Sequence, residues 1–457
     1  MSTEVTRELA RFASELTYDK IPTPVIERIK LCILDSFGCG LFGSTLPWAI
    51  IVADFAKDLG GTSESTVWGR NFKVSAANAA LANGTAVHSF ELDDLHKTSI
   101  VHPGSVVLAP ALALAEALGG CDGKEFLTAV VAGYEVAIRV GMSVGTSHLQ
   151  RGFHPTGTNG TFGAGAAAGK ILRLDQEKMT HALGIAGTQA AGLMAAQYSA
   201  MVKRMHAGRA AQSGVYGALL AQKGLTGITN ILEADYGGYC QVMADSCDME
   251  KLTAGLGEKF ETGRVGFKPY AAGGSTHTSH EAVKSIMEEY KLNADQISKI
   301  TIYTTNATYK HTFWEYKPEG VTAAQMNIPY VVAVTALEHA IFIDQFTEEK
   351  IKDPAIIQFS RKVEVIPDPE LDKLGPELRH VVVAEVQTVD GRTFSRRVET
   401  DKGSDRRPMS TQEVFNKFQL LAGKVLNPKQ VADLQNTVQN LEEFDNIDRI
   451  ALLLAKN

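Results

Sequence analysis

The sequence predicts a mainly α fold: a large all-helical domain built from both ends of the chain, plus a smaller inserted α+β lid domain. Apolar residues recur at helical spacing through the first half. After about residue 265, runs rich in Ile, Thr and Val alternate with a period of two. Helical spacing returns after Gly403. We therefore expect a helical domain over 1–266 and 404–457, and a lid domain over 267–403.

The helices of the first part are predicted from periodic apolar positions and from small residues. Val25, Ile26, Ile29 and Ile33 show the helical spacing clearly. The segments 157–172 and 182–197 are rich in Gly and Ala, so helices there can pack closely in the middle of a core. The other helices are expected over 5–17, 24–44, 75–92, 105–119 and 124–145.

The inserted part mixes both kinds of element. SKITIYTT (298–305) has the alternation and the β-branched residues of a strand, and a helix is expected over 323–342. Further strands are expected over 362–366 and 381–400, with Asp390-Gly391 as a hairpin turn. After the insertion, Ser410 and Glu413 form a capping-box pattern, and residues 428–455 again indicate helices. A cleft between two such domains is a common place for a ligand.

Composition excludes several classes of protein. The chain has 457 residues with 45 basic and 52 acidic side chains, and this balance argues against a nucleic-acid partner. Its five cysteines include no C-x-x-C pair, so reduced thiols and a cytoplasmic location are expected. The start of the chain has no apolar core of the signal-peptide type, and no run of 18 or more apolar residues suggests a membrane span.

The densest group of titratable side chains lies in HSFELDDLHKTSIVHPGS (88–105). If residues 80–95 are helical, His88, Glu91 and Asp94 share one face, Asp93 points elsewhere, and His102 lies on the following loop. Three interpretations are open: a metal site, an acid/base site, or a solvated helix end. We favour acid/base chemistry on an anionic substrate, because His titrates near neutrality and no H-E-x-x-H spacing is present.

Three other segments carry candidate site residues. RGFHPTGTNG (151–160) precedes GAGAAA, which matches a dinucleotide pattern but lacks the preceding strand that such a site requires. VKRMHAGR (202–209) concentrates positive charge and indicates either a solvated face or a carboxylate-binding site. FKPYAAGGSTHTSH (267–280) places a lysine and two histidines where the character of the chain changes.

Together these segments resemble the MmgE/PrpD family over nearly the whole chain. The resemblance is carried by their order and spacing, with no single motif decisive on its own. The segments that carry it include ILDSFGCGLFGS (33–44), ANGTAVHSFELDD (82–94), VHPGSVVLAPALALAE (101–116), VKRMHAG (202–208), STH (275–277) and QMNIPYVVAV (325–334).

The resemblance implies a homodimeric enzyme that needs neither metal nor organic cofactor. Family members include 2-methylcitrate dehydratases, cis-aconitate decarboxylases and iminodisuccinate epimerases. Their shared chemistry removes or moves a group next to a carboxylate of a small di- or tricarboxylic acid. The expected function is therefore a lyase acting on a polycarboxylate. An epimerase, a catalytically silent dimeric binding protein and a metal-dependent hydrolase remain as alternatives.

The resemblance also implies which residues form the site. Leu95 stands where the decarboxylase branch has a hydroxyl residue, so that contact is expected to be either lost or taken over by Thr98 or Ser99. The catalytic set carried over from the family is Glu91, Asp93, His102, Lys203 and His277. The expected substrate-binding residues are His96, His154, Thr156, Arg204, His206 and Lys268, with no metal ligand among them.

Overall fold

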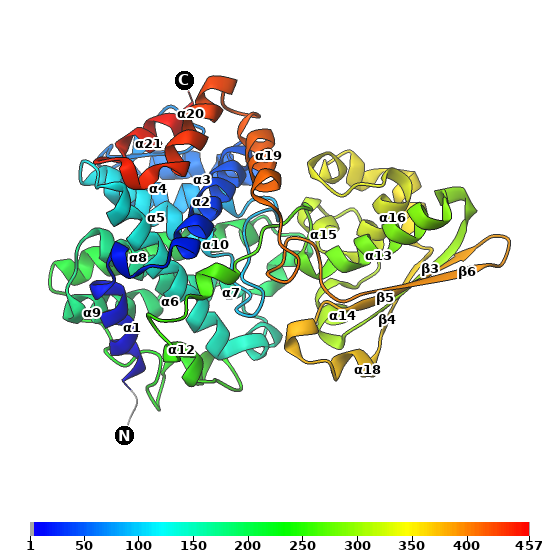
Figure 1. Ribbon diagram of the computed structural model, residues 1–457, viewed down its shortest axis with the longest axis horizontal. Helices are drawn as coiled ribbons and strands as arrows, with labels where there is room; N and C mark the ends of the chain where they lie inside the picture. Colours follow the sequence, from blue (N-terminus) through cyan, green and yellow to red (C-terminus); the bar gives the residue numbers. More distant parts are fainter. Residues whose placement is uncertain (1–3, 457) are drawn as a thin grey trace.

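The computed structural model describes residues 4–456 (Figure 1). Helices from both ends of the chain form one large helical body, and a four-stranded sheet with its helices forms a smaller one beside it. The predicted fold class is confirmed. The long helices of the larger body are α1 (Val5–Glu15), α2 (Thr23–Gly43), α3 (Pro47–Asp58), α4 (Ala76–Val87), α5 (Pro103–Ala117), α6 (Gly123–Gln150), α8 (Gly160–Ile171), α9 (Gln176–Gly187) and α10 (Val202–Gln222).

Short elements complete this body. The strands β1 (Ser65–Thr66) and β2 (Lys73–Val74) pair antiparallel. The short helices are α7 (Pro155–Thr158), α11 (Tyr239–Met243) and α12 (Glu250–Thr253). The helix expected over 182–197 ends earlier, at Gly187, and a 3-10 turn over Met194–Tyr198 follows an irregular stretch.

Small residues set the distances between the central helices. A Cβ added at Gly163 in α8 would lie 2.5 Å from the Gly133 carbonyl oxygen in α6. A Cβ at Gly208 in α10 would lie 2.2 Å from the Leu81 carbonyl oxygen in α4. Side chains cannot fit at these crossings, so the helices pack backbone to backbone, as the composition of 157–172 predicted.

The C-terminal helices return to the N-terminal ones. In Figure 1 the orange and red helices α19 (Thr411–Ala422), α20 (Pro428–Gln439) and α21 (Asp448–Leu454) lie against the blue and cyan helices. Phe418 of α19 is fully buried, and its Cα lies 3.2 Å from where a Cβ of Gly38 in α2 would be. The predicted capping box of Ser410 and Glu413 is present at the start of α19.

The smaller body is built on a sheet with the order β4-β3-β5-β6. Strand β3 (Ile297–Thr304) pairs parallel with β4 (Val363–Pro367) and antiparallel with β5 (Val382–Thr388), which pairs with β6 (Thr393–Val398). Gly391 has a φ of 89° in the β5–β6 turn, where the sequence predicted a hairpin. The helices are α13 (Gly274–Tyr290), α14 (Asn306–Thr312), α15 (Val321–Gln325), α16 (Ile328–Glu338), α17 (Pro354–Ser360) and α18 (Pro369–Asp372).

One helix expected in this body is broken in two. The sequence predicted one helix over 323–342, but α15 ends at Gln325 and α16 begins at Ile328. Asn327 accepts a hydrogen bond from the Tyr330 backbone N–H at 2.9 Å, and Pro329 follows in the first turn. Both features favour a new helix start over continuation. The break leaves Gln325 at a helix end beside the other domain.

The chain crosses between the two bodies at neighbouring points. The Phe267 backbone N–H donates to the Gly403 carbonyl oxygen at 2.9 Å, and Gly266 forms a bridge with Leu95. A Cβ at Gly266 would lie 2.3 Å from the Gly403 carbonyl oxygen, so glycine permits this close approach. The predicted domain boundaries at 266/267 and 403/404 fall at this crossing and stay a prediction.

Helix α6 is long and apolar enough to cross a membrane by length and composition, which the sequence analysis did not anticipate. In its most apolar window, 94% of the residues are buried inside the protein. Helices α2 and α3 pass the same test only as a pair, bent by 88°. A buried central helix of a helical domain has the same length and composition as a membrane span.

Candidate active site

The segment between α4 and α5 is a buried loop and not a helix. Helix α4 ends at Val87, so the prediction that residues 80–95 are helical is wrong beyond this point. Glu91 and Ile100 have φ values of 53° and 57°, which no α-helix accommodates. Leu95 bridges to Gly266, and His96 bridges to Val101. Tertiary contacts thus hold a backbone that local helix propensity does not favour.

Three cationic side chains surround the carboxylate of Glu91. Lys203 and Arg204 begin α10, and Arg204 Nη1 lies 2.7 Å from Glu91 Oε1. Lys268, from the domain crossing, lies 2.9 Å from Glu91 Oε2, and Lys203 pairs with Oε1. All four side chains are buried. Three positive charges against one carboxylate leave the cluster positive, which suits an anionic ligand.

Burial and charge act on the pKa values of this cluster in opposite directions. Burial alone would raise the pKa of Glu91, but the nearby charges of Lys203, Lys268 and Arg204 hold it well below its usual range. Burial lowers the pKa of Lys203 to about 8, although Glu91 partly opposes this shift. Lys203 can therefore change its charge close to physiological pH.

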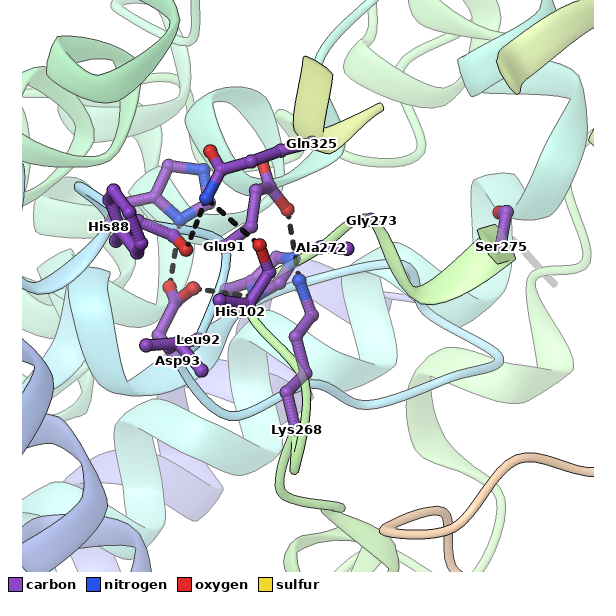
Figure 2. Close-up of polar contacts among 12 residues, drawn as sticks. His88, Glu91, Leu92, Asp93, His102, Lys268, Ala272, Gly273, Ser275 and Gln325 are labelled. Carbon is purple, nitrogen blue, oxygen red and sulfur yellow. Dashed lines mark hydrogen bonds and ion pairs between the residues drawn. The ribbon is translucent and has the colours of Figure 1, made fainter. Parts of the chain in front are cut away.

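Gln325 of α15 links this cluster to the smaller body (Figure 2). Arg204 Nη2 donates to Gln325 Oε1 at 2.8 Å. Gln325 Nε2 donates to the carbonyl oxygens of Phe90 at 3.0 Å and Ala271 at 2.9 Å. Gln325 therefore joins two parts of the chain, the loop that contains Glu91 and the segment that follows Lys268.

Asp93 lies between two histidines, as Figure 2 shows. Its Oδ2 lies 2.7 Å from His88 Nδ1, and its Oδ1 lies 3.2 Å from His102 Nδ1. The expectation that Asp93 points away from His88 is therefore wrong, because the helix that implied it ends at Val87. Burial alone would raise the pKa of Asp93, but His102 and His88 hold it well below its usual range. Burial lowers the pKa of His88 to about 4.

The same three residues also form a possible metal-ligand set. His88, Asp93 and His102 each offer one ligand atom, and these three atoms lie within 4.8 Å of one another. Asp93 already faces both imidazole Nδ1 atoms, an arrangement that orients a histidine for proton transfer. The expectation that this enzyme needs no metal stays a prediction.

Asp94 is not part of this array, although the sequence analysis placed it on a face with His88 and Glu91. Its carboxyl accepts a hydrogen bond from the Tyr134 hydroxyl at 2.8 Å and another from the Gly104 backbone N–H at 3.0 Å. Burial raises the pKa of Asp94 well above its usual range. Asp94 stabilises the start of α5.

A small cavity of about 60 Å³ lies beside both groups of residues. This volume holds only a few water molecules, so a polycarboxylate requires movement of the surrounding parts. Site residues foreseen from the sequence that line the cavity are Glu91, His102, His154, Thr156, Lys203 and Lys268. The His102 backbone N–H donates to Thr156 Oγ1 at 3.2 Å, which fixes the start of α5 against α7.

Other foreseen residues lie outside the cavity lining. His206 contacts His154, with 3.0 Å between the two Nδ1 atoms. His96 contacts Ser99 and lies 3.5 Å from Glu261. Arg204 lies behind Lys203, in the cluster around Glu91.

Neither Thr98 nor Ser99 takes the place of the hydroxyl residue that the decarboxylase branch has at position 95. Leu95 itself lines the cavity, whereas Thr98 and Ser99 do not. Thr98 Oγ1 donates to Glu377 at 3.3 Å, and Ser99 contacts His96. Of the two outcomes that the sequence left open, loss of the contact agrees with this arrangement, because neither Thr98 nor Ser99 lines the cavity.

His277 lies one layer from the cavity. It lines a neighbouring pocket, and Leu95 and Gly274 line both. Its Nε2 donates to the Ala272 carbonyl oxygen at 3.0 Å, and its Nδ1 lies 3.7 Å from Asp401 Oδ2. The structure therefore does not bring His277 into the cavity itself.

The smaller body contributes cavity residues that the sequence analysis missed. They are Ser275, His311, Arg379 and His380. Burial lowers the pKa of His311 to about 4, and it lowers that of His380 well below the usual range. Ser275 Oγ lies 3.0 Å from His380 Nε2. Ser275 lies in the quoted STH segment (275–277) but was given no role, and no quoted segment includes His311, Arg379 or His380. His88 was seen in its cluster but given no role.

Two family models match the chain: the MmgE/PrpD N-terminal domain over residues 7–251 and the MmgE/PrpD C-terminal domain over residues 270–443. The chain is 32% identical over 471 residues to the cis-aconitate decarboxylase-like protein oryM of Aspergillus oryzae, covering 99% of this chain and 97% of that protein. It is 31% identical over 470 residues to the cis-aconitate decarboxylase of Aspergillus terreus, covering 98% and 96%. It is 24% identical over 408 residues to the mitochondrial 2-methylcitrate dehydratase of Yarrowia lipolytica, covering 85% and 77%. With both domain models matched in order on either side of the crossing, the chain belongs to the MmgE/PrpD family.

Proposed function

We propose that this protein is a lyase that removes a group next to a carboxylate of a small polycarboxylic acid, with decarboxylation as the first candidate reaction. The observation that carries the proposal is the cavity shared by the positive cluster around Glu91 and the His88–Asp93–His102 array. Relatives matched over nearly their full length carry decarboxylase names, which favours decarboxylation over dehydration.

The positive cluster binds the substrate in this mechanism. Lys203 and Lys268 line the cavity and hold a substrate carboxylate, while Arg204 supports them from behind through Glu91. Charge already in position stabilises negative charge that develops on the substrate without reorganisation during the reaction. Glu91 keeps the cations close together and is ionised throughout.

His102 is the proton-transfer residue on the larger body. In decarboxylation, the bond from carbon to one carboxylate breaks and CO2 leaves. The electron pair remains on the carbon framework, delocalised toward a neighbouring carboxylate. The imidazolium of His102 then protonates carbon, and Asp93 stabilises that imidazolium and fixes the ring. His88 holds Asp93 from its other side, at 2.7 Å. In dehydration, the same residues would take a proton from carbon while hydroxide leaves.

His277 is the second proton-transfer residue that the family resemblance implies, and we retain it as a proposal. Its place behind Leu95 and Gly274 means that it reaches substrate only if these segments shift. His380 lines the cavity directly and is the competing residue.

The remaining expectations are proposals of the same kind. We propose a homodimer in the cytoplasm without a resident metal or cofactor and without nucleic-acid or membrane partners. Leu193, Met201 and Val202 are exposed apolar residues near the start of α10 and offer a surface for a second copy. The mass of the protein in solution decides between one copy and two.

The proposed reaction is tested by proton NMR in D2O with chelator-treated enzyme on cis-aconitate, 2-methylcitrate, citrate and iminodisuccinate. We expect one tricarboxylate to lose CO2 or water at the same rate with and without chelator. Deuterium exchange without net loss would instead indicate an epimerase. Turnover that returns only with added metal would contradict the metal-independent mechanism, and binding without any exchange would indicate a silent paralogue.

Asp93→Asn is expected to lower kcat by about 10²- to 10⁴-fold, because a neutral amide no longer stabilises an imidazolium at His102. KM should change little, since Asp93 does not line the cavity. Steady-state kinetics and a thermal melt measure both effects. Asp94→Asn is the matched control, because Asp94 is an equally buried neighbour that contacts Tyr134 and Gly104 and neither histidine. Equal losses in both variants would contradict a specific role for Asp93.

The kcat/KM of the wild type should fall as pH rises through about 8, since free Lys203 has its pKa lowered to about 8. Below this pH Lys203 is charged and attracts a substrate carboxylate. Above it the lysine is neutral, so substrate binding weakens. In Lys203→Arg this alkaline limb should disappear, because arginine stays protonated. A pH–rate profile that rises through 8 would show that Lys203 acts as a base instead.

Comparing His277→Ala with His380→Ala assigns the second proton-transfer residue. If His277 has this role, its variant loses about 10²-fold in kcat, and His380→Ala mainly raises KM. The reverse pattern would transfer the role to His380. Wild-type kcat in His277→Ala would end its assignment as a catalytic residue.

A further inference from the structure

Arg379 is a buried arginine whose guanidinium has no protein partner within residues 4–456. Arg379 is only 8% exposed. Within the described chain, its side-chain nitrogens form no hydrogen bond and no ion pair. The other two buried arginines of the described chain each have a carboxylate partner. Arg139 contacts Glu135 and two carbonyl oxygens, and Arg204 contacts Glu91 and Gln325. A buried charge without a counter-charge is costly unless a ligand supplies one.

The backbone of this residue is held firmly in place. The hydroxyls of Thr305 and Thr308 both donate to the Arg379 carbonyl oxygen, at 2.6 and 2.7 Å. The Thr278 hydroxyl donates to the carbonyl oxygen of His380 at 2.6 Å. Three threonine side chains therefore fix the position from which the guanidinium extends. Such support is typical of residues that must be positioned before a ligand arrives.

The acidic groups nearest to Arg379 are already paired with other cations. Asp401 lies 3.2 Å from Lys97, and Glu377 lies 3.2 Å from Arg406. Burial lowers the pKa of Arg379 to about 10, and the charges of Asp401 and Glu377 oppose this shift only in part. At neutral pH the guanidinium is still charged and still lacks its own carboxylate.

Arg379 lines the active-site cavity from the side of the smaller body. It also lines a separate surface hollow of about 440 Å³ that includes Thr98, so it stands between the cavity and solvent. The cluster around Glu91 supplies two uncompensated positive charges from the other side of the cavity. Arg379 adds a third at its outer end.

We propose that Arg379 binds a substrate carboxylate that does not react, and that this contact makes the site select tricarboxylates over dicarboxylates. An arginine fork matches a carboxylate through two parallel hydrogen bonds, which a lysine cannot reproduce. Because Arg379 belongs to the smaller body, the same contact would draw the two bodies together around the ligand. The inference deepens the proposed function, but its test needs no turnover.

The test measures binding of an unreactive tricarboxylate by titration calorimetry at fixed ionic strength. The probe is propane-1,2,3-tricarboxylate, compared with glutarate and methylsuccinate, each of which lacks one of its carboxylates. Arg379→Gln should weaken tricarboxylate binding about 10- to 100-fold, as expected for loss of a charge-assisted contact. Arg379→Lys should restore binding only in part. Arg392→Gln is the control, since Arg392 is exposed and pairs with Asp390 on the β5–β6 turn.

The pattern across ligands separates a specific contact from a general charge effect. The wild type should prefer the tricarboxylate over at least one dicarboxylate, and Arg379→Gln should bind that dicarboxylate within about threefold of the wild type. An equal loss for all three ligands, or unchanged tricarboxylate binding, would overturn the inference. If the tricarboxylate binds through Arg379 but no polycarboxylate is turned over, the inference stands and the proposed lyase function fails.

Discussion

The buried ion cluster around Glu91 is the constraint on which the site depends. Lys203 and Lys268 meet at its carboxylate, and Arg204 joins them from α10. Removing this carboxylate would leave three buried cations without a counter-charge, a larger penalty than the loss of any one contact. Glu91 has a left-handed backbone with a φ of 53°, at the point where its carboxylate meets these cations.

In the proposed mechanism, substrate binding and proton transfer use different carboxylates of one loop. Glu91 faces the cations, and Asp93, two residues later, faces His88 and His102. The left-handed backbone at Glu91 interrupts the regular alternation of side chains, so these two carboxylates reach different partners. Both carboxylates stay ionised despite burial, since each is surrounded by groups that favour its charged form. Charged groups that are already in position could stabilise negative charge on a bound substrate, as the proposed mechanism requires.

The smaller body completes the cavity and does more than cover it. Gln325 joins the Glu91 loop to the crossing segment, and Arg379 and His380 supply polar groups that face the larger body. The break between α15 and α16 leaves Gln325 free to make these contacts at a helix end. The small volume of the cavity means that some of the surrounding residues must move before a polycarboxylate can enter.

The sequence by itself determined the fold class, the α+β insertion, the hairpin at Asp390-Gly391 and the capping box at Ser410, because periodicity and turn chemistry are local. It also indicated Glu91, His102 and Lys203 as site residues through the family resemblance. The tertiary structure alone decided where α4 ends, that Asp93 bridges two histidines, and that His277 lies behind the cavity while Arg379 lines it. These features depend on contacts between residues far apart in sequence, such as Glu91 with Lys268, and local propensity carries no information about such pairs.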